Sequence, residues 1–185
     1  FKQKTAYEIP KRDWSSDVCS SDLSTLHMSA ELFKSLAGLN ILHVPYKSGG
    51  MALIDLLGGR VQVMFPVAAA AVPHAKSGRL RLLAVTSAEP SPLAPGYPTV
   101  AAAGLPGYSS ELTVGLFAPA GTPAPVIERL NSEVVRVLKQ NDSRDRFFEQ
   151  GLQPVSSTPE QLLNAIKAET VKWGKVIREA GIKAD

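Results

Sequence analysis

The sequence predicts an α/β domain in which helices cover a parallel or mixed β-sheet. Two observations lead to this class. Short apolar segments of strand length alternate with longer segments in which apolar residues recur every three or four positions. Hydroxyl residues and glycines stand at the two ends of these longer segments, where helices begin and end. With 44% hydrophobic and 20% charged residues, the chain also has the composition of a globular protein that can bury a core.

Residues 1–23 differ from the rest, because they show no sustained helical or strand period and contain Cys19, the one cysteine of the chain. This stretch resembles translated sequencing-adapter read-through, a kind of peptide found fused to truncated open reading frames. We therefore expect a non-native extension, with the native part starting at about Ser24. A disordered native N-terminus is the alternative. In either case we assign no function to residues 1–23.

Helices and strands alternate over the next part of the chain. Ser24 and Thr25 precede a helix that ends at Gly38, and a strand is expected at 41–45. After a turn at 48–50, a short helix places Met51, Ile54 and Leu57 on one face. The remaining segments are a strand at 60–65, an alanine-rich helix at 67–76 that Pro73 disturbs, and a strand at 80–86 that is apolar enough to lie centrally in a sheet.

The second half begins with a Pro- and Gly-rich surface connection at 89–107, followed by an extended segment at 108–119. Two strong helices then finish the chain. The first has Thr122 as N-cap. The second begins with a capping box at 158–161 and ends at Gly181, and its apolar stripe includes Trp173, which we expect to lie in a core.

Several classes of function are disfavoured. The net charge of +3 comes from dispersed side chains, and aromatic residues are only 6%, so no nucleic-acid partner is expected. The longest apolar run, at 61–72, is too short for direct membrane insertion. Metal-ligand spacings, nucleotide-binding loops and a nucleophile elbow are absent from the sequence, so no cofactor or metal is expected and few catalytic candidates remain. A small Ser/His hydrolase is the less favoured alternative, because it would rest on residue types alone.

Two helix starts are suited to binding an anion. The first carries Ser24, Thr25 and His27, and the second follows Tyr46 and Lys47 with Ser48, Gly49 and Gly50. A helix N-terminus offers free N–H groups and a partial positive charge, and glycines allow a ligand to approach the backbone. The two starts could hold one small carboxylate between them. Capping alone would equally explain Ser24 and Thr25, and Tyr46 could simply pack at a strand end.

Five blocks carry a family resemblance: STLHMSAELF, HVPYK, AVTS, PTVAAAGLPGY and GLFAPAGTP. In this order and spacing they are similar to the substrate-binding receptors of tripartite tricarboxylate transporters, also called Bug receptors. The resemblance implies a periplasmic binding protein and not an enzyme. It also implies a type II-like α/β fold, truncated so that most of lobe one and the start of lobe two are missing. Residues 24–108 would be part of lobe two. Residues 109–185 would be the crossing strand and the C-terminal helices of lobe one.

The resemblance also implies a function. Such receptors capture a small carboxylate in the periplasm and deliver it to the permease subunits of the transporter, although no signal peptide is visible in these residues. The ligand contacts that carry over are Ser24, Thr25, His27, Tyr46, Ser48 and Gly49, with Lys47 as a weaker candidate. Departures from the family pattern occur at Pro66, at Thr113 and Val114, and at Ser48, and they leave the ligand identity open.

Two consequences follow if half of the receptor is missing. Ligand binding should be weak, because one side of the cleft is absent. The apolar stripes of the last two helices should be partly exposed, which favours association. The alternative from another class is a stand-alone protein-interaction module, whose exposed stripes bind a partner protein.

Overall fold

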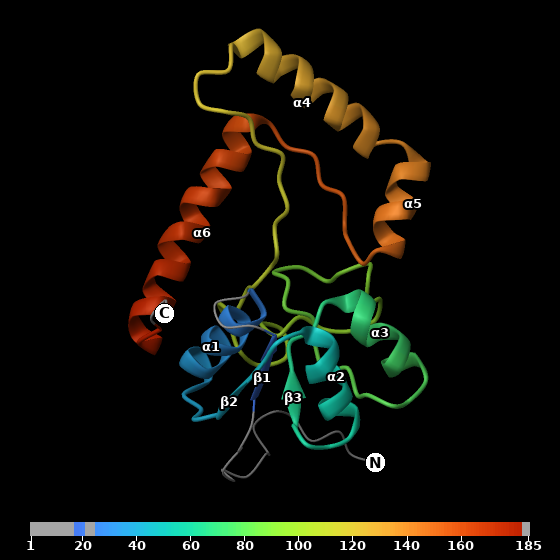
Figure 1. Cartoon of the computed structure of the whole chain (residues 1–185), viewed down its shortest axis with the longest axis vertical. Coiled ribbons are helices and arrows are strands. Elements are labelled where there is room, and N and C mark those ends of the chain that lie inside the picture. Colours follow the sequence, from blue (N-terminus) through green and yellow to red (C-terminus); the bar gives the residue numbers. More distant parts are fainter. Residues whose placement is uncertain (1–16, 21–24, 183–185) are drawn as a thin grey trace. The chain divides into compact units, whose positions relative to one another are not determined.

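The computed structural model describes residues 17–20 and 25–182 (Figure 1). The predicted contact Ser24 therefore lies outside the described residues. The chain divides into two compact units: one comprises the chain up to Leu112 together with the segment from Lys175 onward, and the other is Thr113–Gly174. The first division falls close to the expected boundary at 108/109. The final residues, however, group with the first unit, and the assignment of lobes stays a prediction.

The first unit contains a parallel three-stranded sheet with the order β2-β1-β3 (Figure 1). Its strands are β1 (Asp17–Ser20), β2 (His43–Tyr46) and β3 (Val63–Met64). In the register, Asp17 lies opposite both His43 and Val63. The central strand thus comes from residues in which the sequence pattern predicted no strand. The strands expected at 41–45 and 60–65 exist, but both are shorter or displaced by a residue.

Helices α1 (Thr25–Ala37) and α2 (Gly49–Leu57) cover opposite faces of this sheet. His27 of α1 stacks on His43, whereas Tyr46 packs against Ala52 of α2. Side chains alternate between faces along a strand, and His43 and Tyr46 are an odd number of positions apart in β2. The two histidines therefore mark the α1 face, and Tyr46 marks the α2 face.

The expected central strand at 80–86 is absent. In its place, Val85 and Thr99 form an isolated parallel bridge, and the side chain of Leu83 is 62% exposed. Residues 80–86 are apolar, as expected of a central strand, but they form no strand. The strand β1 takes the central position in the sheet instead. Helix α3 (Ala68–Lys76) runs through Pro73 instead of ending before it.

The second unit holds α4 (Ala124–Leu138), α5 (Asn141–Glu149) and most of α6 (Pro159–Ala180). All of residues 113–174 are described, and none of them is buried. On α4, for example, Val126 and Leu130 are 46% and 45% exposed. This exposure confirms the prediction that the apolar stripes of these helices are partly open. The sequence did not predict α5.

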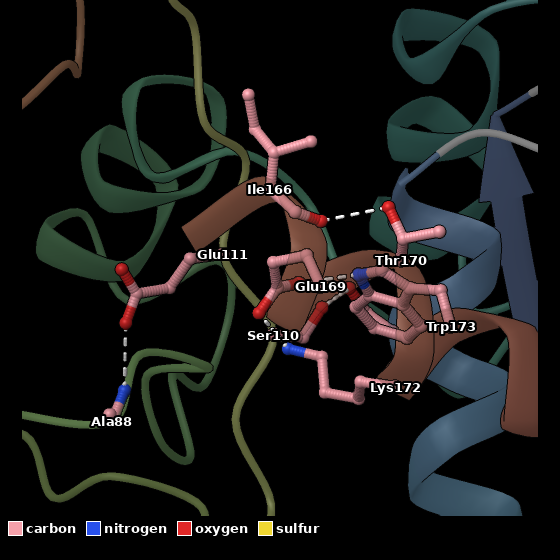
Figure 2. A network of polar contacts seen from close by, with 9 residues as sticks. Ala88, Ser110, Glu111, Ile166, Glu169, Thr170, Lys172 and Trp173 are labelled. Carbon is pink, nitrogen blue, oxygen red and sulfur yellow. Dashed lines mark hydrogen bonds and ion pairs between the residues drawn. The ribbon is translucent and has the colours of Figure 1, made fainter. Parts of the chain in front are cut away.

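Trp173 corrects another expectation, because it is only partly buried and does not lie in a core. Its indole N–H donates a hydrogen bond of 2.6 Å to Glu169 (Figure 2). Lys172 pairs with the other oxygen of the same carboxylate and lies 4.6 Å from the centre of the indole ring. The tryptophan is therefore part of a polar cluster on the surface of α6.

Candidate functional site

The starts of α1 and α2 lie at one edge of the sheet. Helix α1 follows β1 and helix α2 follows β2, and these two strands are parallel neighbours in the sheet. The carboxyl ends of parallel strands meet at the same edge, so the helix that follows each strand begins there. The helices α1 and α2 then run along opposite faces. In the order β2-β1-β3 the chain reverses its direction across the sheet after β2, so the topological switch point, where open α/β sheets bind ligands, lies between β1 and β3 at this same edge.

The start of α2 is built as an N-cap followed by two glycines. Ser48 has extended backbone angles (φ −156°, ψ 152°), and its hydroxyl accepts a hydrogen bond of 3.4 Å from the N–H of Met51. Gly49 and Gly50 form the first turn of the helix itself and not a turn before it. A Cβ atom built on Gly50 would meet no atom within 4 Å. The space beside this first turn is therefore open to a small ligand.

The start of α1 is Thr25, which is half-buried. Its carbonyl oxygen accepts a hydrogen bond of 2.8 Å from the hydroxyl of Ser29, one turn further along the helix. The first N–H groups of a helix have no acceptor within the helix, and they carry its partial positive charge. Thr25 and Gly49 thus bring two sets of such donors to the same edge of the sheet.

The imidazole of His27 is held inside the fold. Its ring stacks on His43 with 4.1 Å between centroids and an angle of 13° between planes. Its Nε2 atom lies 3.7 Å from a carboxylate oxygen of Glu31, which also pairs with Lys34 at 2.7 Å. Only 8% of His27 is exposed. The side chain predicted as a ligand contact therefore has internal contacts on the α1 face.

Tyr46 is directed at α2. Its hydroxyl donates a hydrogen bond of 2.7 Å to one carboxylate oxygen of Asp55. The other oxygen of Asp55 accepts a hydrogen bond of 2.9 Å from Arg60. The hydrogen bond to the carboxylate, followed by burial, raises the pKa of Tyr46. The hydrogen bond from Tyr46 lowers the pKa of Asp55, against the opposing effect of burial and with further help from Arg60. The polar group of Tyr46 is thus engaged within its own helix–strand pair.

The structure therefore brings together some of the predicted contacts and separates others. The backbone at Thr25, Ser48 and Gly49 lies at the same edge of the sheet, and Lys47 is exposed next to Ser48 in the chain. The side chains of His27 and Tyr46 lie on opposite faces of the sheet, so they do not converge.

Sequence reasoning missed the residues that hold the first turn of α1. Ser29, Tyr108 and Ser110 are buried and joined by hydrogen bonds. The one signal in the sequence is that Ser29 stands a full helical turn after Thr25. Nothing local indicates that residues 108–110 contact this helix.

Two further findings concern metal ligands and membrane spans. In the part of the chain that the structure describes, no group of three or more His, Cys, Asp or Glu side chains is placed to hold a metal ion. Among the described helices, none has the length and apolar character needed to cross a membrane. The chemistry that the sheet edge offers is hydrogen-bond donation to an anion.

A protein-family model and several solved structures are similar to this chain, and they point to the same family. The model described as "Tripartite tricarboxylate transporter family receptor" matches residues 16–182, a range that includes β1 and begins before the expected start at Ser24. The chain spans about half the length of the curated relatives it matches.

Solved structures are similar over most of this chain. Rpa4515 of R. palustris, solved with adipate, is 37% identical, with a TM-score of 0.75 over 93% of this chain and 57% of that one. The periplasmic binding protein BugD is 27% identical, with a TM-score of 0.70 over 94% and 58%. MatC from Rhodopseudomonas palustris, solved with bound malate, is 32% identical, with a TM-score of 0.67 over 89% and 57%. These matches confirm the predicted α/β fold of a periplasmic binding protein, present here in part.

Proposed function

Because this chain belongs to the family of tripartite tricarboxylate transporter receptors, we propose that it binds a small carboxylate as part of a periplasmic receptor that supplies such a transporter. The partners are then the carboxylate itself and the permease subunits in the membrane. The chain spans about half the length of its curated relatives. The proposal therefore concerns the part of the receptor that these residues build.

One observation carries the proposal: two helices begin at the same edge of the sheet, at the carboxyl ends of the neighbouring strands β1 and β2. A carboxylate placed near one helix N-terminus is stabilised by about 0.3–1 kcal/mol at an exposed site, and by up to about 2 kcal/mol where it is partly buried. Two starts acting on one anion add to each other. The adipate bound in Rpa4515 and the malate bound in MatC support a dicarboxylate as the ligand class.

The proposed contact set remains Ser24, Thr25, His27, Tyr46, Ser48 and Gly49. Within it, we assign the donor role to the backbone of Thr25, Ser48 and Gly49 and to the Thr25 hydroxyl. The stacking of His27 on His43 and the bond from Tyr46 to Asp55 favour indirect roles for these two side chains. They hold the two helices against the sheet, and each would contact the ligand only by exchanging its internal partner.

Calorimetric titration of the 185-residue chain with adipate tests the proposal. We expect a dissociation constant in the millimolar range, about −4 kcal/mol, because this chain spans about half the length of its curated relatives. Adipamide, the uncharged diamide of the same length, should give no heat of binding. If neither adipate nor malate binds at any accessible concentration, the proposal is wrong.

Two variants of Ser48 form a matched pair. Asp and Asn are both as good at the N-cap as Ser, so Ser48→Asp and Ser48→Asn should fold equally well. Only Ser48→Asp places a negative charge at the start of α2. We expect about a tenfold loss of adipate affinity in Ser48→Asp relative to Ser48→Asn, equivalent to about 1.4 kcal/mol. Equal affinities would place the anion elsewhere.

A further inference from the structure

Ser29 connects the first turn of α1 to a distant segment of the chain. Its hydroxyl proton goes to the carbonyl oxygen of Thr25 at 2.8 Å. The hydroxyl of Ser110 lies 2.7 Å from the same oxygen atom of Ser29. Since a hydroxyl has a single proton, Ser110 must be the donor in this second bond. The order of donation is therefore Ser110 to Ser29 to Thr25.

Tyr108 holds the same residue by a second route. Its hydroxyl donates a hydrogen bond of 3.0 Å to the carbonyl oxygen of Ser29. Its ring lies edge-on to Phe33 of α1, with 6.2 Å between centroids. Tyr108 is 1% exposed and Ser110 is 2% exposed. We call Ser29, Tyr108 and Ser110 the Ser29 clamp.

The segment that bears the clamp is itself fixed within the first unit. The N–H of Ser110 donates a hydrogen bond of 2.8 Å to Thr86, and Glu111 accepts one of 2.9 Å from the N–H of Ala88 (Figure 2). Directly after these residues the chain leaves the first unit, at the boundary between Leu112 and Thr113. The clamp thus lies between the start of α1 and the point where the chain passes to the second unit.

Hydroxyl groups buried to this degree lose free energy when they lose a partner. A shift of residues 108–110 must therefore either carry Ser29 with it or break these hydrogen bonds. A serine bonded to the carbonyl one turn earlier also bends the helix backbone locally. The clamp therefore joins the carbonyl of Thr25, in the first turn of α1, to residues 108–110.

We propose that Ser110 and Tyr108 are positioning residues for the carboxylate site and act through Ser29 on the first turn of α1. This inference rests on the proposed function, because it assigns these residues to that same site. It adds that ligand affinity at α1 is linked to the position of the segment where the chain passes to the second unit. A bound carboxylate and the path of residues 108–112 then influence each other.

The test uses four variants of the whole chain. Tyr108→Phe removes one hydroxyl and keeps the ring contact with Phe33. Ser110→Ala removes the other hydroxyl, and Ser110→Thr keeps it. The matched control is Ser77→Ala, because Ser77 also donates to a backbone carbonyl, that of His74 at 3.1 Å, but lies outside the clamp. For each variant, amide NMR spectra are recorded without ligand and during titration with adipate.

We expect Tyr108→Phe and Ser110→Ala to shift the amide signals of residues 25–28 in the free protein and to weaken adipate binding about fivefold to tenfold. Ser110→Thr should restore binding to within about twofold of the unchanged chain, and Ser77→Ala should have no effect. If Ser110→Ala does not fold, as judged by circular dichroism, Tyr108→Phe decides the question alone.

The outcomes separate this inference from the proposed function. If adipate binds but the clamp variants match Ser77→Ala in affinity, the positioning role is wrong and the proposed function stands. If adipate does not bind, the proposed function fails and the positioning role at the carboxylate site fails with it, and shifted signals of residues 25–28 in the clamp variants would show only that the clamp holds the first turn of α1. If neither effect is seen, both are wrong.

Discussion

Tyr46 and Asp55 are joined by a hydrogen bond of 2.7 Å that runs from the phenol hydroxyl to the carboxylate. This bond ties the last residue of β2 to the second half of α2, so it holds the helix whose N-terminus offers donors to the proposed ligand. Arg60 pairs with the other carboxylate oxygen at 2.9 Å. The three side chains form a small network on the α2 face of the sheet, in which the pKa of Tyr46 is raised and the pKa of Asp55 is lowered.

The lowered pKa of Asp55 predicts that the folded chain loses stability in acid. The pKa of Asp55 in the folded chain lies below its usual value of 3.8, chiefly because Tyr46 donates to the carboxylate. The unfolded chain therefore takes up this proton at a higher pH than the folded chain does. The stabilisation is complete above about pH 4 and is lost as the pH falls through the lower pKa of the folded state. Urea unfolding at a series of pH values should show this slope in the unchanged chain.

The slope should be smaller in Asp55→Asn, which cannot titrate at this position. Asp145→Asn serves as the control, because Asp145 is an exposed aspartate on α5. Parallel pH profiles for the unchanged chain and Asp55→Asn would show that the carboxylate of Asp55 does not contribute.

The raised pKa of Tyr46 predicts that the folded chain loses stability in alkali. Its pKa is raised above the usual value of 10.0 by the hydrogen bond to Asp55. A raised pKa stabilises the fold below the pKa of the unfolded state, and this contribution is lost as the pH rises through the folded value. Absorbance titration should therefore contain a late tyrosine step that disappears in Tyr46→Phe. In Asp55→Asn the same step should move to lower pH, and an unmoved step would contradict this assignment.

Breaking the capping box of α6 should destabilise the start of this helix. Thr158 and Gln161 exchange hydrogen bonds, with the N–H of Thr158 bonded to the Gln161 side chain at 2.9 Å and the N–H of Gln161 bonded to the Thr158 hydroxyl at 3.1 Å. Thr158→Ala should cost about 1 kcal/mol and Thr158→Ser very little. Amide hydrogen exchange in the first turn of α6 measures the difference. Equal exchange rates in the two variants would contradict it.

The open face of α4 predicts self-association. Val126 and Leu130 stand one turn apart and are about half exposed, in a unit without buried residues among 113–174. Replacing both by Ser should weaken association at least about tenfold, since each apolar side chain contributes about 1.5–3 kcal/mol when fully buried. Glu128→Ser on the same helix is the control, and sedimentation velocity is the measurement. A monomeric chain with cooperative unfolding would contradict this prediction and favour the stand-alone interaction module.

Local signals in the sequence predicted helix ends well. The helix stops expected at Gly38 and Gly181 are found, and both glycines have the positive φ angles, 62° and 65°, that suit glycine. The capping box at Thr158 was correct because every group in it lies within one turn. Thr122 was expected as the N-cap of α4, but Pro123 takes that position, one residue later.

Tertiary choices could not be predicted in the same way. On α2, Met51 and Ile54 of the predicted apolar face are 53% and 67% exposed, whereas Ala52 is fully buried. Period alone shows which residues share a face of a helix, but the neighbouring sheet decides which face is covered. Helix α5 was missed because its sequence, NDSRDRFFE, has almost no apolar stripe.

The candidate site shows the same division. The start of α1 at Thr25 was recognised from its cap hydroxyls, which are local. Residues 48–50 were expected as a turn before α2, but Ser48 is its N-cap and Gly49 and Gly50 lie in its first turn. The contact between Ser29 and Ser110 joins residues 81 positions apart, so no sequence window contains it. The engagement of Tyr46 by Asp55 was likewise not predicted, because it depends on how α2 lies on β2.

The most direct test of the account is to map adipate on the isotopically labelled chain by amide NMR. We predict that the largest shifts during titration occur at residues 25–27 and 48–50, with smaller shifts at Ser29 and Ser110. Shifts that instead cluster on α4 and α6, or that equal those produced by adipamide, would contradict a carboxylate site at the starts of α1 and α2.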